Sequence, residues 1–134
     1  MATVNSVTCK RKITLKNIVT ETFKINLVIE IQNNINNIQN NINQSEQVIT
    51  KIRQESGDKQ PDIKQIEQER LKLMAQKKMS ENRIQEVKQL KHGSIYTTSQ
   101  VDGFTQLKPV DDVREKLGNV EILCKDYIIQ KMTV

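Results

Sequence analysis

The feature that most constrains this chain is a row of apolar residues, mostly isoleucines, spaced three and four apart from Val28 to Ile52. This spacing places side chains along one side of an α-helix, as in the seam of a coiled coil. A second row of the same kind runs from Ile63 to Val87. The sequence therefore predicts two long helices whose coiled-coil seam is Val28, Ile31, Ile35, Ile38, Ile42, Ile49, Ile52, Ile63, Ile66, Leu73, Ile84 and Val87.

The two rows match if the chain folds back between them. In an antiparallel pair Ile52 faces Ile63, and every further facing pair, down to Val28 with Val87, has residue numbers that add up to the same 115. Between the rows, residues 57–61 contain the glycine and proline typical of a helix end and a helix start. We therefore expect an antiparallel hairpin over residues 21–92 with its turn near 57–61, capped at its start by Thr20.

The middle of this predicted hairpin carries polar residues in the seam. The register places Ser45 opposite Arg70 and Ile38 opposite Lys77. In one interpretation the two cations extend to water and the polar layers fix the register. In the other, a partner binds at this level, and its contact surface includes the residues in or just beside the seam, which are Arg70, Met74, Lys77 and Leu90.

Both ends of the chain are rich in β-branched residues, which favour strands. We expect two strands before residue 20, a turn at Asp102-Gly103, a short helix near residues 109–118, and a final hairpin around Lys125-Asp126. The predicted fold is α+β, with the coiled-coil hairpin inserted in a small antiparallel β-sheet or barrel. Residues 1–20 and 93–134 would form the β domain, because strands this short need each other to be stable.

The charge of the chain is uneven. The net charge is +5, and residues 1–20 contain four basic residues and no acidic one, namely Lys10, Arg11, Lys12 and Lys16. These are possible RNA contacts, because clustered cations attract phosphates. Lysine is also common on exposed strand edges, which is the alternative interpretation. Aromatic side chains that could stack on bases are scarce. Tyr96 and Phe104 could do so, but core packing is the expected use of both.

No pattern in the sequence predicts catalysis. There is no glycine-rich phosphate loop, no nucleophile elbow and no pair of zinc-ligand motifs. The single histidine, His92, fits a helix end, and Asp111 and Asp112 fit the capping of a short helix. Cys9 and Cys124 are expected to be free thiols. We therefore predict a protein that is not an enzyme, with no catalytic residue, cofactor or metal, no small-molecule substrate and no membrane span.

The order of features resembles the YlqD-like family of small bacterial, cyanobacterial and plastid proteins. The resemblance rests on Ile13–Thr20, which leads directly into a helix, on the long helical pair, and on the ending Asn119–Ile129. At the last hairpin the family usually has Asp-Gly, whereas Tyr127 stands here in place of the glycine. The resemblance implies no known enzymatic activity and brings no catalytic residues.

Two function classes remain open at this point. The first is a structural, assembly or adaptor protein that acts through its coiled-coil arm in a larger protein complex. The second is an RNA- or ribosome-associated factor that binds through the basic N-terminal strand. The richness in Asn, Ile and Lys, which have A/T-rich codons, together with the resemblance, indicates a plastid-encoded protein of the stroma, with the cytoplasm as the alternative location. The sequence does not identify the partner, the oligomeric state, or which part carries the function.

Overall fold

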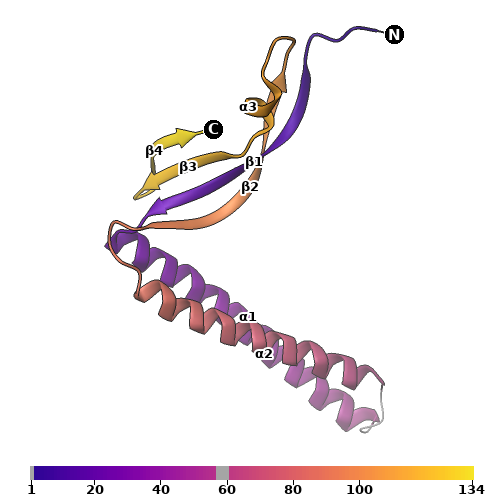
Figure 1. Ribbon diagram of the computed structural model, residues 1–134. Helices are drawn as coiled ribbons and strands as arrows, with labels where there is room; N and C mark the ends of the chain where they lie inside the picture. The colour runs from indigo at the N-terminus through magenta and orange to yellow at the C-terminus, as the bar shows by residue number, and fades with distance from the viewer. Residues whose placement is uncertain (1, 57–60) are drawn as a thin grey trace. The chain divides into compact units, whose positions relative to one another are not determined.

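The computed structural model describes residues 2–56 and 61–134. The elements in chain order (Figure 1) are β1 (Val7–Ile18), α1 (Glu21–Ser56), α2 (Pro61–Lys88), β2 (Ile95–Leu107), α3 (Val113–Leu117), β3 (Val120–Lys125) and β4 (Ile128–Thr133). They divide into two compact units, the first made of residues up to Phe23 with Lys91–Val134, the second of Lys24–Leu90. The predicted turn near 57–61 lies, at Gly57 to Gln60, outside the described residues.

β1 is a single strand where the sequence predicted two. The basic cluster Lys10-Arg11-Lys12 lies inside it and does not interrupt it. Successive side chains of a strand point to opposite faces, so Lys10 and Lys12 share one face and Arg11 lies on the other. The register of β1 against β2 is irregular between Leu15 and Lys16. The cations are tolerated because alternation spreads them over both faces.

The first unit contains a mixed four-stranded sheet in the order β2-β1-β3-β4. β1 is antiparallel to β2 and parallel to β3, and β3 is antiparallel to β4. The expected all-antiparallel sheet is therefore wrong for the β1–β3 pair, and the four strands form an open sheet with β2 and β4 at its edges. The reason lies in residues 108–119, which include α3 and return the chain to the far side of β1 before β3 begins.

The predicted turn at Asp102-Gly103 is also wrong, because both residues lie inside β2. Gly103 pairs with Arg11 of β1, and a Cβ atom placed there would collide with the Cδ1 atom of Ile13. The glycine thus allows a neighbouring side chain to lie over the strand. The predicted final hairpin is present between β3 and β4, but its two-residue turn is Asp126-Tyr127, one residue later than the expected Lys125-Asp126.

The start of α1 and the segment before β2 are held together within the first unit. Thr20 caps α1, since its Oγ1 accepts a hydrogen bond of 3.1 Å from the backbone nitrogen of Phe23. The backbone of Val19 exchanges hydrogen bonds with Gly93 and Ser94, each 2.8 Å long. Val19 and Phe23 are buried, and the Phe23 ring lies 5.9 Å from the ring of Tyr96, centroid to centroid. Tyr96 therefore packs in the core, as expected.

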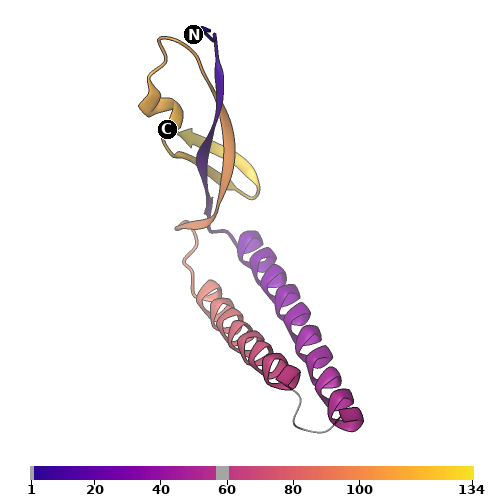
Figure 2. The same ribbon diagram turned by 90° about the vertical axis from the view of Figure 1, so that its right-hand side faces the viewer.

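The second unit is a pair of long antiparallel helices that lie side by side in both views (Figures 1 and 2). Of the twelve predicted seam residues, the structure buries eight and half-buries four: buried are Ile31, Ile35, Ile38, Ile42, Ile49, Ile63, Ile84 and Val87, and half-buried are Val28, Ile52, Ile66 and Leu73. This burial supplies the main stabilisation of the pair, because apolar surface leaves water on every turn.

Contacts between the two helices follow the predicted direction. Near one end Arg53 pairs with Glu67 at 2.8 Å. At the other end Lys24 Nζ donates hydrogen bonds to the carbonyl oxygens of Lys88 and Leu90, at 2.9 and 3.0 Å. A cation at this place satisfies carbonyls that the end of α2 leaves without intrahelical donors. α2 ends at Lys88, a few residues before the stop predicted at His92-Gly93.

Candidate interaction site

The middle of the helix pair contains the polar layers that the sequence predicted. Arg70 Nη1 lies 3.6 Å from Glu46 Oε1 on α1, while the Arg70 Nε atom is buried and has no hydrogen-bond partner among the described residues. Ser45 does not bind Arg70, because its Oγ donates to the carbonyl oxygen of Asn41 on its own helix. The Arg70 side chain is about one-third exposed. The Arg70 Nε–H group is thus a buried donor without an acceptor among the described residues.

Lys77 forms the second polar layer. Its Nζ donates a 2.7 Å hydrogen bond to Gln39 Oε1 across the pair and lies 3.9 Å from Glu81 Oε1 on its own helix. The ammonium group therefore leaves the seam for the side of the pair, where about one-third of the side chain remains exposed. This is the arrangement expected when a lysine buries its stem and keeps its charge near water.

A hollow of about 310 Å³ lies between the two helices at this level. We call it the central groove; its lining residues are Gln39, Ile42, Glu46, Met74, Lys77, Lys78 and Glu81. Ile42 is buried, whereas Met74 is 49% exposed and its neighbour Leu71, one turn earlier on α2, is 59% exposed. An apolar floor is therefore surrounded by two lysines and two glutamates.

The four predicted partner-surface residues are only partly brought together. Arg70, Met74 and Lys77 follow each other along one side of α2, and Met74 and Lys77 line the central groove. Leu90 is half-buried and lies beyond the end of α2, sixteen residues further along the chain. At about 1.5 Å per helical residue it is too distant to belong to the groove. Its role in this unit is to offer its carbonyl oxygen to Lys24.

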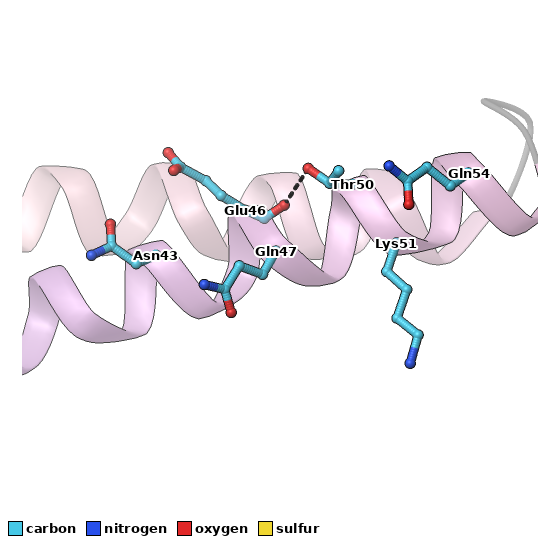
Figure 3. Close-up of a pocket in the computed structure, with 6 residues that line it drawn as sticks. All are labelled: Asn43, Glu46, Gln47, Thr50, Lys51 and Gln54. Carbon is cyan, nitrogen blue, oxygen red and sulfur yellow. Dashed lines mark hydrogen bonds between the residues drawn. The ribbon is translucent and has the colours of Figure 1, made fainter.

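A second hollow lies on the outer side of α1 (Figure 3). It is lined only by polar residues of that helix, which are Asn43, Glu46, Gln47, Thr50, Lys51 and Gln54. Thr50 Oγ1 donates to the carbonyl oxygen of Glu46, and Figure 3 shows the Lys51 side chain extending away from the others. No apolar floor and no convergent charges are present here, so this hollow has the chemistry of an ordinary solvated helix surface.

The four cations of β1 have different surroundings. Arg11 donates to the carbonyl oxygens of Glu115 and Gly118, at 2.7 and 2.8 Å, and so fastens the end of α3 to the sheet. Lys16 pairs with Glu121 at 3.1 Å. Lys10 and Lys12 are exposed and make no ion pair or hydrogen bond within the part of the chain that the structure describes. Two of the four candidate RNA contacts are thus occupied by structural roles.

For Phe104 the sequence left base stacking open and favoured core packing. Its expected use was core packing, but its side chain is 71% exposed and its Cα partner across the sheet is Lys10. The alternation of residues along β2 already indicates that Phe104 is exposed. The residues that share its face by period two, Asp102 and Gln106, are polar, while Val101 and Leu107 have the opposite phase. An apolar residue on the polar face of a strand is exposed unless another element covers that face.

The remaining candidate residues have structural roles. Asp112 is the N-cap of α3, where its Oδ1 accepts a 2.9 Å hydrogen bond from the Arg114 backbone nitrogen. The Arg114 side chain, followed by its backbone N–H, lowers the pKa of Asp112. Asp111 accepts a 2.8 Å bond from the backbone nitrogen of Lys108. Cys9 and Cys124 are free thiols, as predicted.

Among residues 2–56 and 61–134 no cluster of histidine, cysteine and acidic side chains could hold a metal ion. In the same part of the chain no helix is both long and apolar enough to span a membrane.

Comparison with known proteins identifies the family. No curated protein matches the chain. The chain is similar to a protein of unknown function from Synechococcus sp. WH 8102, whose crystal structure has a TM-score of 0.75, with 27% sequence identity over 96% of this chain and 95% of that one. The model of the YlqD protein family matches residues 7–132, which is nearly the whole sequence. The chain therefore belongs to the YlqD protein family.

Proposed function

We propose that this protein is a non-enzymatic adaptor or assembly protein whose helix pair, acting as a coiled-coil arm, binds a partner protein at the central groove. The observation that carries the proposal is the groove itself, where half-exposed Met74 lies above buried Ile42 in an otherwise polar stretch. An apolar side chain of a partner would fill it and exclude water.

The chemistry of the groove defines the partner. The rim contains two lysines and two glutamates, so a partner helix with both charge signs beside one apolar anchor is complementary.

A photo-crosslinking amino acid at position 74 tests the proposal. In native lysate it should capture one defined protein complex, and nuclease treatment should not change the capture. The same crosslinker at Gln47, on the polar outer hollow of α1, is the matched control and should capture nothing specific. Equal capture from both positions, or no capture from position 74, would overturn the groove as the binding site.

A second candidate function is that of an RNA- or ribosome-associated factor. It is favoured by Lys10 and Lys12, which are exposed and are not paired within the described part of the chain. Because Arg11 and Lys16 already have partners, the double variant Lys10→Gln with Lys12→Gln is a sharper test than changing all four. This function predicts ribosomal or RNA partners that are lost on nuclease treatment and whose capture weakens as salt rises.

The proposed location is the plastid stroma. The support is the richness of the chain in residues with A/T-rich codons and its similarity to a cyanobacterial protein. An antibody against the protein should recover it in the stromal fraction of purified plastids. Recovery from the cytoplasm alone would contradict the proposal.

A further inference from the structure

The two longest strands extend beyond the rest of the sheet. β3 pairs only with residues 13–17 of β1, whereas β2 pairs with β1 along its whole length from Val7 to Ile18. Residues 7–12 of β1 and 102–107 of β2 therefore form a two-stranded ribbon with no third strand beside them (Figures 1 and 2). We call this segment the β-ribbon.

One face of the β-ribbon is covered. Arg11 lies on this face and binds the carbonyl oxygens at the end of α3, while the Ile13 side chain lies over Gly103. α3 is in contact with both β1 and β2. Most side chains of this face, including Cys9 and Leu107, are consequently half-buried, whereas Val7 at its end is exposed.

The opposite face is open and combines an aromatic ring with cations. By alternation it presents Lys10 and Lys12 from β1 and Asp102, Phe104 and Gln106 from β2. Phe104 is directly opposite Lys10, at a distance where cross-strand side chains touch. All five residues are exposed, and neither lysine is paired within the described part of the chain, although Asp102 is the Cα partner of Lys12.

We propose that this face of the β-ribbon binds single-stranded nucleic acid, with a base stacked on Phe104 and phosphates bound by Lys10 and Lys12. The inference rests on the second candidate function and specifies its ligand and its site. Lys10 and Lys12 are two residues apart on a strand, about 7 Å, which is close to the spacing of successive phosphates in an extended single strand. Gln106 adds an amide able to hydrogen-bond a base edge.

Single strands fit this surface better than the alternatives. A duplex hides the faces of its bases, so it would leave the Phe104 ring in water. A protein partner needs a shaped apolar patch, but polar residues flank Phe104 along β2 and Lys10 faces it. Stacking, in contrast, needs only a flat ring and tolerates any base sequence.

Fluorescence anisotropy with the full chain tests the proposal, using a labelled twelve-nucleotide RNA of mixed sequence and a blunt duplex of the same sequence. The single strand should bind more tightly than the duplex. Phe104→Ala should weaken single-strand binding by about tenfold to a hundredfold, whereas Phe104→Tyr, which keeps a ring, should stay within about threefold. Circular dichroism checks that each variant is folded.

The cations are tested through the salt dependence. Lys10→Gln with Lys12→Gln should reduce the slope of log affinity against log salt by about 1.4, which corresponds to two lost phosphate contacts. The matched control is Lys64→Gln with Lys72→Gln, which removes the same charge from exposed positions of α2 and should leave the slope unchanged.

Three outcomes distinguish a failure of the stacking site from a failure of the RNA-associated function. If single strand and duplex bind equally and Phe104→Ala has no effect, the stacking site is wrong while the RNA-associated function stands. If neither nucleic acid binds, both are wrong, and the adaptor function of the central groove is unaffected. If Phe104→Ala instead abolishes capture of a protein or of anionic vesicles, the β-ribbon serves another ligand and the inference is overturned.

Discussion

At the scale of the single residue, the turn between β3 and β4 departs from ordinary backbone preference at two adjacent positions. Asp126 has a φ of 48° and Tyr127 a φ of 69°, so both are in the left-handed region. Two-residue hairpin turns favour this geometry, and Asp followed by Gly is the usual solution. Asp126 tolerates the region and accepts a 2.5 Å hydrogen bond from Thr20 Oγ1, whereas a tyrosine in it is strained.

Tyr127→Gly should therefore stabilise the protein. Relief of the left-handed strain stabilises the folded state by about 1–2 kcal/mol. The greater freedom of glycine in the unfolded chain offsets part of this gain, so the free energy of unfolding should rise by about 0.5–1 kcal/mol. Little packing is lost, since the Tyr127 side chain is 67% exposed. Urea denaturation measures the change. Lys125→Gly, inside β3, is the control and should destabilise; a loss of stability in Tyr127→Gly would contradict the argument.

Asp112 provides a pH-dependent contribution at the same scale. Hydrogen bonds from the Arg114 side chain, then from its backbone, hold the pKa of Asp112 below its ordinary value of 3.8. Because the lowered pKa belongs to the folded state, the contribution is fully present above pH 3.8 and is lost as the pH falls through the lower folded value.

The variant Asp112→Asn should keep a capping oxygen but lose this pH dependence. Its urea midpoint should lie below that of the wild type at pH 7, and the difference should shrink as the pH is lowered below 3.8. Asp102→Asn serves as the control, since no hydrogen bond to the Asp102 carboxylate is present within the described residues. A difference that grows on acidification would have the wrong sign and would refute the role of the carboxylate.

At the scale of the element, the helix pair carries a polar residue that costs stability. Arg70 buries its Nε without an acceptor among the described residues, and its contact with Glu46 is long and partly exposed. A buried donor without a partner is unfavourable, and a partly exposed ion pair of this length contributes little.

Arg70→Leu should consequently raise the stability of the helix pair by about 1 kcal/mol, measured as the midpoint of thermal unfolding at 222 nm. Lys77→Leu is the matched variant one layer along. Its gain should be smaller or absent, because the Lys77 ammonium has a good acceptor in Gln39. If Arg70→Leu lowers the midpoint, the buried donor is better satisfied in solution than its surroundings show. If it also weakens partner capture, Arg70 is retained for binding.

The helix pair was also the part that the sequence predicted best. Seam residues such as Ile42 and Ile84 repeat with one period over many turns, and the two facing rows agree on a single register. The strands of the sheet contain no comparable internal agreement. Short strands look alike whether their neighbour is parallel or antiparallel, and the direction of β3 depends on the path of residues 108–119. The same limit applies to Phe104, because its exposure depends on the register with β1 and on α3 covering only the other face.

At the scale of the whole molecule, the chain passes between its two units only at Phe23-Lys24 and Leu90-Lys91. The strands that close the first unit come from both chain ends, while the second unit is continuous in sequence. Each unit has its own buried residues, Val19 and Phe23 in the first and the seam isoleucines in the second. The proposed protein-binding groove belongs to the second unit and the proposed nucleic-acid face to the first.

The two units should accordingly unfold as separate transitions. Both tyrosines of the sequence, Tyr96 and Tyr127, belong to the first unit, so the near-ultraviolet tyrosine signal reports on the sheet alone, while ellipticity at 222 nm reports mainly on the helices. Ile42→Asp with Leu73→Asp places two charges in the seam at a cost above about 4 kcal/mol, enough to unfold most of the helix pair. The 222 nm signal should fall, and the tyrosine transition should keep its midpoint.

The converse variant completes this test. Ile13→Asp puts a charge beside Gly103 in the sheet and should lower the tyrosine transition while the 222 nm transition keeps its midpoint. If each variant moves both signals together, the molecule unfolds as one cooperative body, and the groove and the β-ribbon are energetically coupled. If the signals move separately, a partner bound to the helix pair stabilises that unit alone, because ligand binding raises the stability of the unit that it contacts. The midpoint that rises on binding then identifies which surface is occupied.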